Sequence, residues 1–405
     1  MGRRVLVTGC GAVTAAGLGL PALWHAARDG VSAVRPLDLA RPLKSNVRIA
    51  ARLEHFDPAA HIDAAVLPFC DRFTQFALVA AAEALAQAGL PAGERLGPRT
   101  AVIVGTGIGG AETIEAGIHN AYVTGQRIDP WSVPRLMPNA AASQISARIG
   151  AQGPSFAVSS ACASGAQAIG LGAHMVRAGL VERAVVGGAE ACITASGMKS
   201  WEALRVLSPD LCRPFSRDRN GMTLGEGAGI FVLEDEETAA RRGARPLAEL
   251  LGYGTSSDAG DIVRPDPGGA AAAMAAALAD AGLAAGAVDY VNAHGTGTIA
   301  NDAAETAALR EVFGERLAAL PVSSTKPVHG HALGAAGAIE LAVTLAALAA
   351  GIVPPTLNWT TPDPRCELDC VPGAARPHPI GIAMSNSFAF GGINASLVLG
   401  RVEGT

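Results

Sequence analysis

Short runs of β-branched residues alternate with long Ala-rich runs along most of this chain. This alternation predicts α/β layering, in which parallel strands are buried between helices. Each of the four clearest helical runs is followed by a glycine, where a left-handed helix C-cap is expected. The expected helices are Asp71–Ala88, Ala163–Ala178, Gly268–Ala281 and Gly334–Ala350. The expected strands are Val5–Thr8, Thr100–Gly105, Arg183–Gly187, Gly229–Leu233, Tyr290–Ala293 and Ala395–Leu399.

The length of 405 residues allows two or three folding units or one large duplicated core. A modest boundary lies near residues 240–246, where Arg241, Arg242 and Arg245 cluster and a new strand pattern begins at Leu247. We therefore divide the chain into an N-terminal part, 1–243, and a C-terminal part, 244–405.

Composition excludes several classes of protein. The net charge is -5 and there is no basic tract, which argues against nucleic-acid binding. The longest strongly apolar stretch without charge, Leu341–Val353, is shorter than the roughly 20 residues of a membrane span. Seven scattered cysteines do not indicate a disulfide framework, and the pair Cys366 and Cys370 lacks the further ligands of a zinc site. We expect a cytoplasmic protein without metal, nucleic-acid or membrane binding.

Two glycine-rich segments suggest nucleotide binding only superficially. Gly105–Gly110 fits G-x-G-x-x-G after a strand, but the nearest acidic candidate, Asp129, is followed by three prolines and does not end a second strand. Val7–Thr14 fits neither this pattern nor a phosphate-binding loop. Tight packing between strand and loop is the alternative that we favour for both segments.

Cys162 lies between a strand-like run and the first turn of an Ala-rich helix. Unpaired N–H groups and the helix dipole at such a position favour a thiolate, so we expect a lowered thiol pKa there. Cys162 is thus a candidate nucleophile. The alternative is a small buried hydrophobic residue, which describes most cysteines.

Three histidines occupy junctions at which α/β proteins place catalytic groups. His294 directly follows an apolar strand, and His331 precedes an Ala-rich helix. Both are candidate partners for a cysteine nucleophile. His329 has a similar setting, and its role stays open.

These segments together resemble a β-ketoacyl-[acyl-carrier-protein] synthase of the thiolase-like condensing-enzyme superfamily. The similarity covers nearly the whole chain. The family's fold implies five αβαβα layers built from two similar βαβ-rich halves, as a homodimer or as a heterodimer with a ketosynthase-like subunit. The matching segments are residues 7–14, 105–110, 137–139, 158–166, 187–190, 213–215, 225–229, 292–298, 326–337 and 386–394.

The resemblance implies the roles of five residues. Cys162 matches the acylated nucleophile, and His294 and His331 match the two histidines of the elongating type. Lys326 and Glu340 match a lysine and a glutamate that orient His331.

The resemblance also implies a gate and two binding regions. Phe390 matches a gating aromatic residue whose N–H forms an oxyanion hole with that of Cys162, and Thr296 and Thr298 match positions that contact phosphopantetheine. Three arginines match weaker candidates for docking an acidic acyl carrier protein: Arg72, Arg205 and Arg213.

The implied reaction is decarboxylative condensation of a Cys-bound acyl chain with malonyl-acyl carrier protein. It requires no cofactor beyond the phosphopantetheine of the carrier protein. One alternative is a non-catalytic subunit that shapes the pocket of a partner ketosynthase. A cysteine protease is a second, but the family signature around its cysteine is missing here.

Four departures from the family pattern favour a specialised pathway over housekeeping fatty-acid synthesis. Ala389 replaces a glycine of the gating loop, where a Cβ disfavours positive φ and stiffens the gate. Ile393 replaces a common threonine, and Asp261 stands where a histidine is frequent. The helix entry at Asp71-Arg72 is poor in basic residues.

Overall fold

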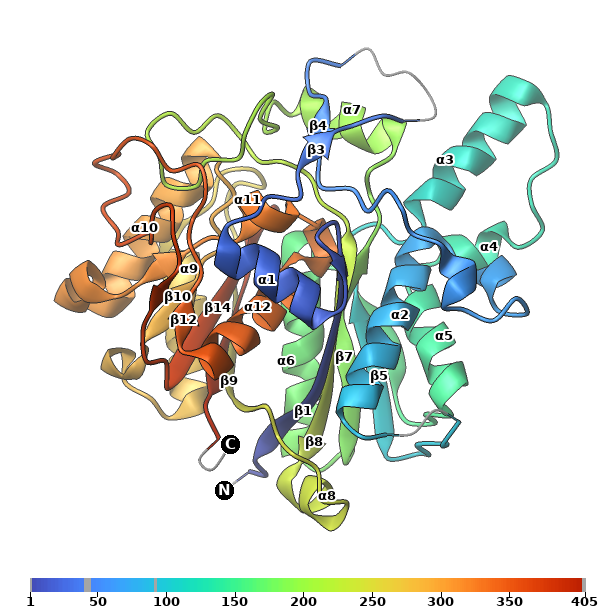
Figure 1. Cartoon of the computed structure of the whole chain (residues 1–405), viewed down its shortest axis with the longest axis horizontal. Coiled ribbons are helices and arrows are strands. Elements are labelled where there is room, and N and C mark those ends of the chain that lie inside the picture. The colour runs from blue at the N-terminus through green and yellow to red at the C-terminus, as the bar shows by residue number, and fades with distance from the viewer. Residues whose placement is uncertain (1, 40–44, 91–92, 403–405) are drawn as a thin grey trace.

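A computed structural model describes residues 2–39, 45–90 and 93–402 (Figure 1). The strands are β1 (Val5–Thr14), β2 (Gly17–Leu18), β3 (Arg35–Pro36), β4 (Ile49–Ala50), β5 (Thr100–Gly105), β6 (Ser155–Val158), β7 (Arg183–Glu190), β8 (Gly227–Asp235), β9 (Ala248–Ser257), β10 (Tyr290–Asn292), β11 (Val322–Ser323), β12 (Ile352–Val353), β13 (Arg376–Pro377), β14 (Ile382–Ala389) and β15 (Ile393–Gly400). The α-helices are α1 (Leu20–Asp29), α2 (Arg72–Gln87), α3 (Ala111–His119), α4 (Ser132–Leu136), α5 (Ala140–Ile149), α6 (Ser164–Arg177), α7 (Ala195–Ala203), α8 (Glu236–Arg241), α9 (Pro267–Ala281), α10 (Ile299–Phe313), α11 (Lys326–His329) and α12 (Ala336–Ala350).

The sheet is built from two halves with the same topology. Its strands run in the order β11-β10-β14-β15-β9-β1-β8-β7-β5-β6, and β2 pairs with β1 at the side. Read from the outer edge to the junction, the strands follow the order β6-β5-β7-β8-β1 in the first half and β11-β10-β14-β15-β9 in the second. If the strands of each path are numbered along the chain, both orders are third, second, fourth, fifth and first. The two halves join where β1 pairs with β9 through Leu6 and Val7.

Helices cover both faces of each half and give five layers. The buried helices α6 and α12 pack against each other between the two halves, and their side chains belong to the largest core cluster. Helices α2 and α5 cover the outer face of the first half, and α9 and α10 that of the second (Figure 1). This confirms the thiolase-like αβαβα fold of two similar halves.

Strand direction differs from the prediction. Only the outer strands of each half are parallel, whereas β8, β1, β9 and β15 are antiparallel to their neighbours. All residues of β1 and β8 are buried, so these antiparallel strands have the continuous apolar pattern that usually indicates a parallel strand. The expected buried parallel strands are therefore present only in the outer part of each half.

The four predicted helices are present, with ends shifted by a few residues. Each closing glycine has positive φ: +70° at Gly89, +71° at Gly179, +67° at Gly282 and +64° at Gly351. The boundary predicted at residue 243/244 falls between α8 and β9, and it stays a prediction.

One helical stretch, Leu333–Ala350, is long and apolar enough to cross a membrane by length and composition. It is 83% buried inside the protein and includes α12. Its apolar character is that of a core helix packed on all sides.

Candidate active site

A strained turn presents Cys162 at the start of α6. The chain leaves β6, and Ala161 adopts φ +48°, a conformation that side chains rarely take. The Ser164 hydroxyl accepts from the Ser160 N–H at 2.8 Å and donates to the Ala161 carbonyl at 2.6 Å, which fixes the turn. The Cys162 side chain then points into a cavity, with 4% of the residue exposed.

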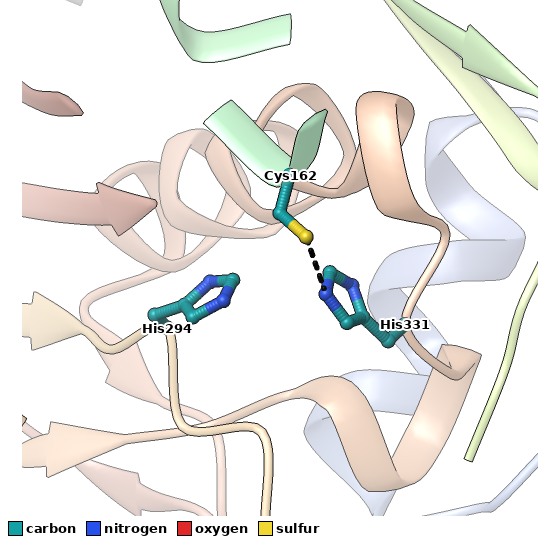
Figure 2. A group of neighbouring side chains, drawn as sticks. All are labelled: Cys162, His294 and His331. Atoms are coloured by element: carbon teal, nitrogen blue, oxygen red, sulfur yellow. Dashed lines mark hydrogen bonds between the residues drawn. The ribbon is translucent and has the colours of Figure 1, made fainter. Parts of the chain in front are cut away.

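Two of the three candidate histidines meet this thiol (Figure 2). The Nε2 atom of His331 lies 3.1 Å from the Cys162 sulfur, and the rings of His294 and His331 are 5.2 Å apart, nearly perpendicular. His329 lies outside this group. Its ring nitrogens bond to the Thr325 hydroxyl at 3.0 Å and to the Gly330 carbonyl at 2.8 Å, so both are engaged away from the thiol.

A buried charge network fixes the tautomer of His294. The Lys326 ammonium lies 3.2 Å from His294 Nδ1 and donates to the His294 carbonyl at 2.5 Å, and it pairs with Glu340. Because an ammonium group only donates, Nδ1 accepts and the proton resides on Nε2. Glu305 accepts from the backbone N–H of His294 and of Gly295, both at 2.8 Å.

This network corrects one implication of the resemblance. Lys326 and Glu340 were expected to orient His331, but the Lys326 ammonium contacts His294 instead. The Nδ1 atom of His331 is buried and has no hydrogen-bond partner among the described residues. The ring is held through its backbone, whose N–H donates to the Thr223 carbonyl at 2.7 Å. The contact of Nε2 with the Cys162 sulfur is compatible with either tautomer, and no other described residue bonds to a ring nitrogen of His331.

Burial controls the ionisation of all three groups. It lowers the pKa of His294 and of His331 well below the ordinary value, and the positive charge of Lys326 lowers both further. Burial raises the pKa of the Cys162 thiol to about 12, against the opposing effects of Lys326 and of the Phe390 N–H. The predicted low thiol pKa is therefore wrong for the resting protein, in which a thiol faces two neutral imidazoles.

Phe390 begins the turn between β14 and β15, beside the thiol. Its backbone N–H faces the Cys162 sulfur and acts to lower the pKa of the thiol. Its ring stacks on Trp201 of α7, with centroids 5.8 Å apart. Gly391 and Gly392 follow at φ +88° and +68°. Trp201 and Phe390 lie far apart in the chain and meet only because the fold brings them together. No sequence pattern therefore predicts the contact between their rings.

Ala389 does not occupy the positive-φ conformation that its Cβ would disfavour. It is the last residue of β14, it pairs with Ile393 of β15, and its φ is not positive. A glycine is not required at this position. The two residues of the turn that need positive φ are both glycines.

The cavity that contains Cys162 also contains the predicted phosphopantetheine residues. Thr296 and Thr298 line it, with their hydroxyls 2.9 Å apart. Trp201, Val206 and Met222 give it an apolar wall.

The three predicted docking arginines differ in their availability. Arg72 is largely buried, pairs with Glu226 at 2.6 Å and stacks over Phe76, so its expected role in docking does not fit its position. Arg213 is held by Asp210 at 2.7 Å. Arg205 is exposed and makes no ion pair with any residue in the described ranges.

The glycine-rich segment Gly105–Gly110 is explained by packing. Buried Glu190 accepts from the N–H groups of Gly107 at 2.6 Å and Ile108 at 3.3 Å, the groups that a phosphate would need. It also accepts from the Gly334 N–H at 3.0 Å, which ties the loop to the second half. This agrees with the packing alternative and disfavours dinucleotide binding.

Cys162, His294 and His331 offer donor atoms within 4.8 Å of one another, the types that zinc prefers. However, the lone pair of His294 Nδ1 is occupied by the ammonium of Lys326, and Nε2 carries the proton. His294 is therefore arranged to donate a hydrogen bond, not to bind a metal ion.

Comparison with known proteins agrees with this geometry. Residues 2–239 match the family "Beta-ketoacyl synthase, N-terminal domain", and residues 247–360 match "Beta-ketoacyl synthase, C-terminal domain". The chain is 45% identical to nodulation protein E of Rhizobium sp. (strain N33), over 99% of this chain and all of that one. It is 41% identical to 3-oxoacyl-[acyl-carrier-protein] synthase 2 of Staphylococcus aureus (strain COL), over 99% of each. A solved structure described as the ishigamide ketosynthase/chain length factor superimposes with a TM-score of 0.94 at 35% identity, covering 99% of this chain and 100% of that one.

Proposed function

Because this chain belongs to the β-ketoacyl synthase family, we propose that Cys162, His294 and His331 divide the steps of its reaction among them. The enzyme condenses a Cys-bound acyl chain with malonyl-acyl carrier protein and releases carbon dioxide. The observation that carries the assignment is the 3.1 Å contact between the Cys162 sulfur and His331 Nε2.

In acyl transfer, His331 acts as the base. Its neutral Nε2 takes the thiol proton, and the sulfur attacks the thioester carbonyl carbon of the acyl donor. The N–H groups of Cys162 and Phe390 donate to the tetrahedral oxyanion. The bond to the phosphopantetheine sulfur then breaks, and the leaving thiolate takes the proton back from His331.

In condensation, both histidines donate hydrogen bonds. Malonyl-carrier protein loses carbon dioxide, and the electron pair of the broken C–C bond forms an enolate whose oxygen accepts from Nε2 of His294 and of His331. The enolate carbon attacks the Cys162 thioester, and the expelled thiolate takes up a solvent proton through His331. Because the tautomer of His331 is not fixed, its Nε2 atom can accept the thiol proton during acyl transfer and donate a hydrogen bond to the enolate oxygen during condensation.

Further proposals concern partners, pathway and location. An acyl carrier protein delivers both substrates, and a second ketosynthase-like chain, identical or not, completes a dimer. Asp261 and Ile393 support a specialised pathway, and the chain acts in the cytoplasm. The intact triad supports a catalytic subunit over one that only shapes a partner's pocket.

The test combines intact mass and product analysis on the purified chain. Incubation with an acyl-carrier protein should increase the chain's mass by one acyl group, located on Cys162. Subsequent malonyl-carrier protein labelled in its free carboxylate should release labelled carbon dioxide and one β-ketoacyl product per acylated site. An unacylated chain would refute the assignment.

A further inference from the structure

The active-site cavity changes character between the thiol and the surface. Cys162 and Thr296 at its inner end are buried. Thr298 and Asn301 are half-buried, and Arg264 at its outer end is exposed. The lining residues thus range from a buried nucleophile, through half-buried hydroxyl and amide groups, to an exposed cation.

Arg264 is the only Lys or Arg that lines this cavity within the described parts of the chain. Its guanidinium makes no ion pair or side-chain hydrogen bond with any residue in those parts. The one carboxylate lining the cavity, Asp258, is occupied: it accepts from the Asn394 amide at 2.7 Å and from the Asp266 N–H at 2.9 Å. An anion at the cavity mouth thus meets an exposed guanidinium without an ion pair in those parts. The nearby carboxylates are Asp258, which is already satisfied, and Asp261, which accepts from backbone N–H groups and also feels the charge of Arg264.

The loop that carries Arg264 is held in place by specific bonds. Asp261 accepts from the N–H groups of Val263 at 2.8 Å and Arg264 at 3.0 Å. The Ile262 carbonyl accepts from the Gly391 N–H at 2.8 Å, which joins this loop to the turn that begins at Phe390. Asp261, which departs from the family pattern, therefore serves to shape the backbone that presents Arg264.

We propose that Arg264 binds the phosphodiester of the phosphopantetheine arm while the acyl thioester reaches Cys162. The inference rests on the proposed function, in which that arm enters this cavity. The arm carries a thioester at one end, amide and hydroxyl groups along its length, and a single negative charge at the other end. The lining groups follow the same order, and a guanidinium is well suited to a phosphodiester.

The experiment compares two small acyl donors with the same acyl chain. One is the acyl-pantetheine, and the other is the methyl diester of acyl-4′-phosphopantetheine, which has the single charge of the carrier-bound arm. Acylation of Cys162 is followed by intact mass, and kcat/KM is compared at low salt. The intact enzyme should favour the phosphodiester by about tenfold, the size of one charge-assisted contact.

Variants identify the residue responsible. In Arg264→Ala the ratio of the two kcat/KM values should fall to about one, and Arg264→Lys should give an intermediate ratio because it keeps the charge but loses the fork. Arg310→Ala, at the opposite end of α10 from the cavity, is the matched control and should keep the tenfold ratio. A tenfold ratio in Arg264→Ala, or a ratio of one in the unaltered enzyme, would overturn the proposal. Failure of both donors to acylate Cys162 would instead contradict the proposed function.

Discussion

The two halves of the molecule enter their central helices through the same backbone turn but use it differently. In the first half, Ala161 at φ +48° begins a short 3-10 turn that leads into α6. In the second half, Leu333 at φ +41° begins the equivalent turn into α12. The residue that follows is Cys162 in one half and Gly334 in the other.

Space explains the difference. The side chain of Cys162 points into the cavity, whereas a Cβ on Gly334 would lie 2.2 Å from the Gly107 backbone nitrogen. Gly334 instead donates its N–H to Glu190 at 3.0 Å, and the second half supplies His331 from the residues before the turn. A duplicated turn can thus present a nucleophile in one half and join the halves in the other.

The largest expected effect is on Cys162→Ala. This variant should lose acyl loading and condensation completely, because the thiol that accepts the acyl group is gone, while its melting temperature stays near that of the unaltered chain. Intact mass after incubation with acyl-carrier protein measures the loading. Normal β-ketoacyl formation by this variant would contradict the assignment of the nucleophile to the first turn.

At the second turn, Gly334→Ala should damage the fold rather than the chemistry directly. The added Cβ meets backbone atoms that cannot rotate away, so we expect a loss of about 3 kcal/mol or more in the free energy of unfolding. Denaturant titration measures it. Gly117→Ala in α3, where a Cβ meets nothing within 4 Å, is the control and should cost nothing. Equal stability of both variants would show that the second turn is not a tight joint.

A smaller effect is expected for Ala161→Gly. Glycine removes the strain of positive φ, about 1 kcal/mol, but adds a similar freedom to the unfolded chain. The free energy of unfolding should change by less than about 1 kcal/mol. A large loss of acyl loading without a loss of stability would show that the strained alanine itself positions the thiol.

The smallest effect is expected for Ala389, the last residue of β14 before the turn that begins at Phe390, because this alanine does not adopt positive φ. Ala389→Gly should leave the acyl-loading rate unchanged for short and long primers, since Ala389 ends a regular strand. Stopped-flow loading with both primers measures this. Faster loading of the long primer would restore the idea that the Cβ stiffens the gate.

The sequence predicted the parts of this arrangement that depend on local pattern. The glycine-closed helices were predictable because helix periodicity and C-capping are local, and Cys162, His294 and His331 because they lie at junctions of strands, loops and helices. Strand direction was not, since strands buried on both faces look alike in sequence whether parallel or antiparallel.

Contacts between distant segments were also beyond sequence reasoning. The approach of Lys326 to His294 rather than to His331, the stacking of Trp201 on Phe390 and the occupation of Arg72 by Glu226 depend on packing. The raised pKa of Cys162 depends on how completely the fold buries the thiol, which outweighs the favourable helix start.

The most direct test of this account measures the two half-reactions separately in His294→Ala and His331→Ala. His294 is fixed as a donor, so His294→Ala should acylate Cys162 at nearly the normal rate but lose at least about 10²-fold in carbon dioxide release. His331→Ala should lose at least about 10²-fold in both half-reactions, because His331 also takes the thiol proton. Acylation slowed equally in the two variants would contradict the division of roles between the histidines.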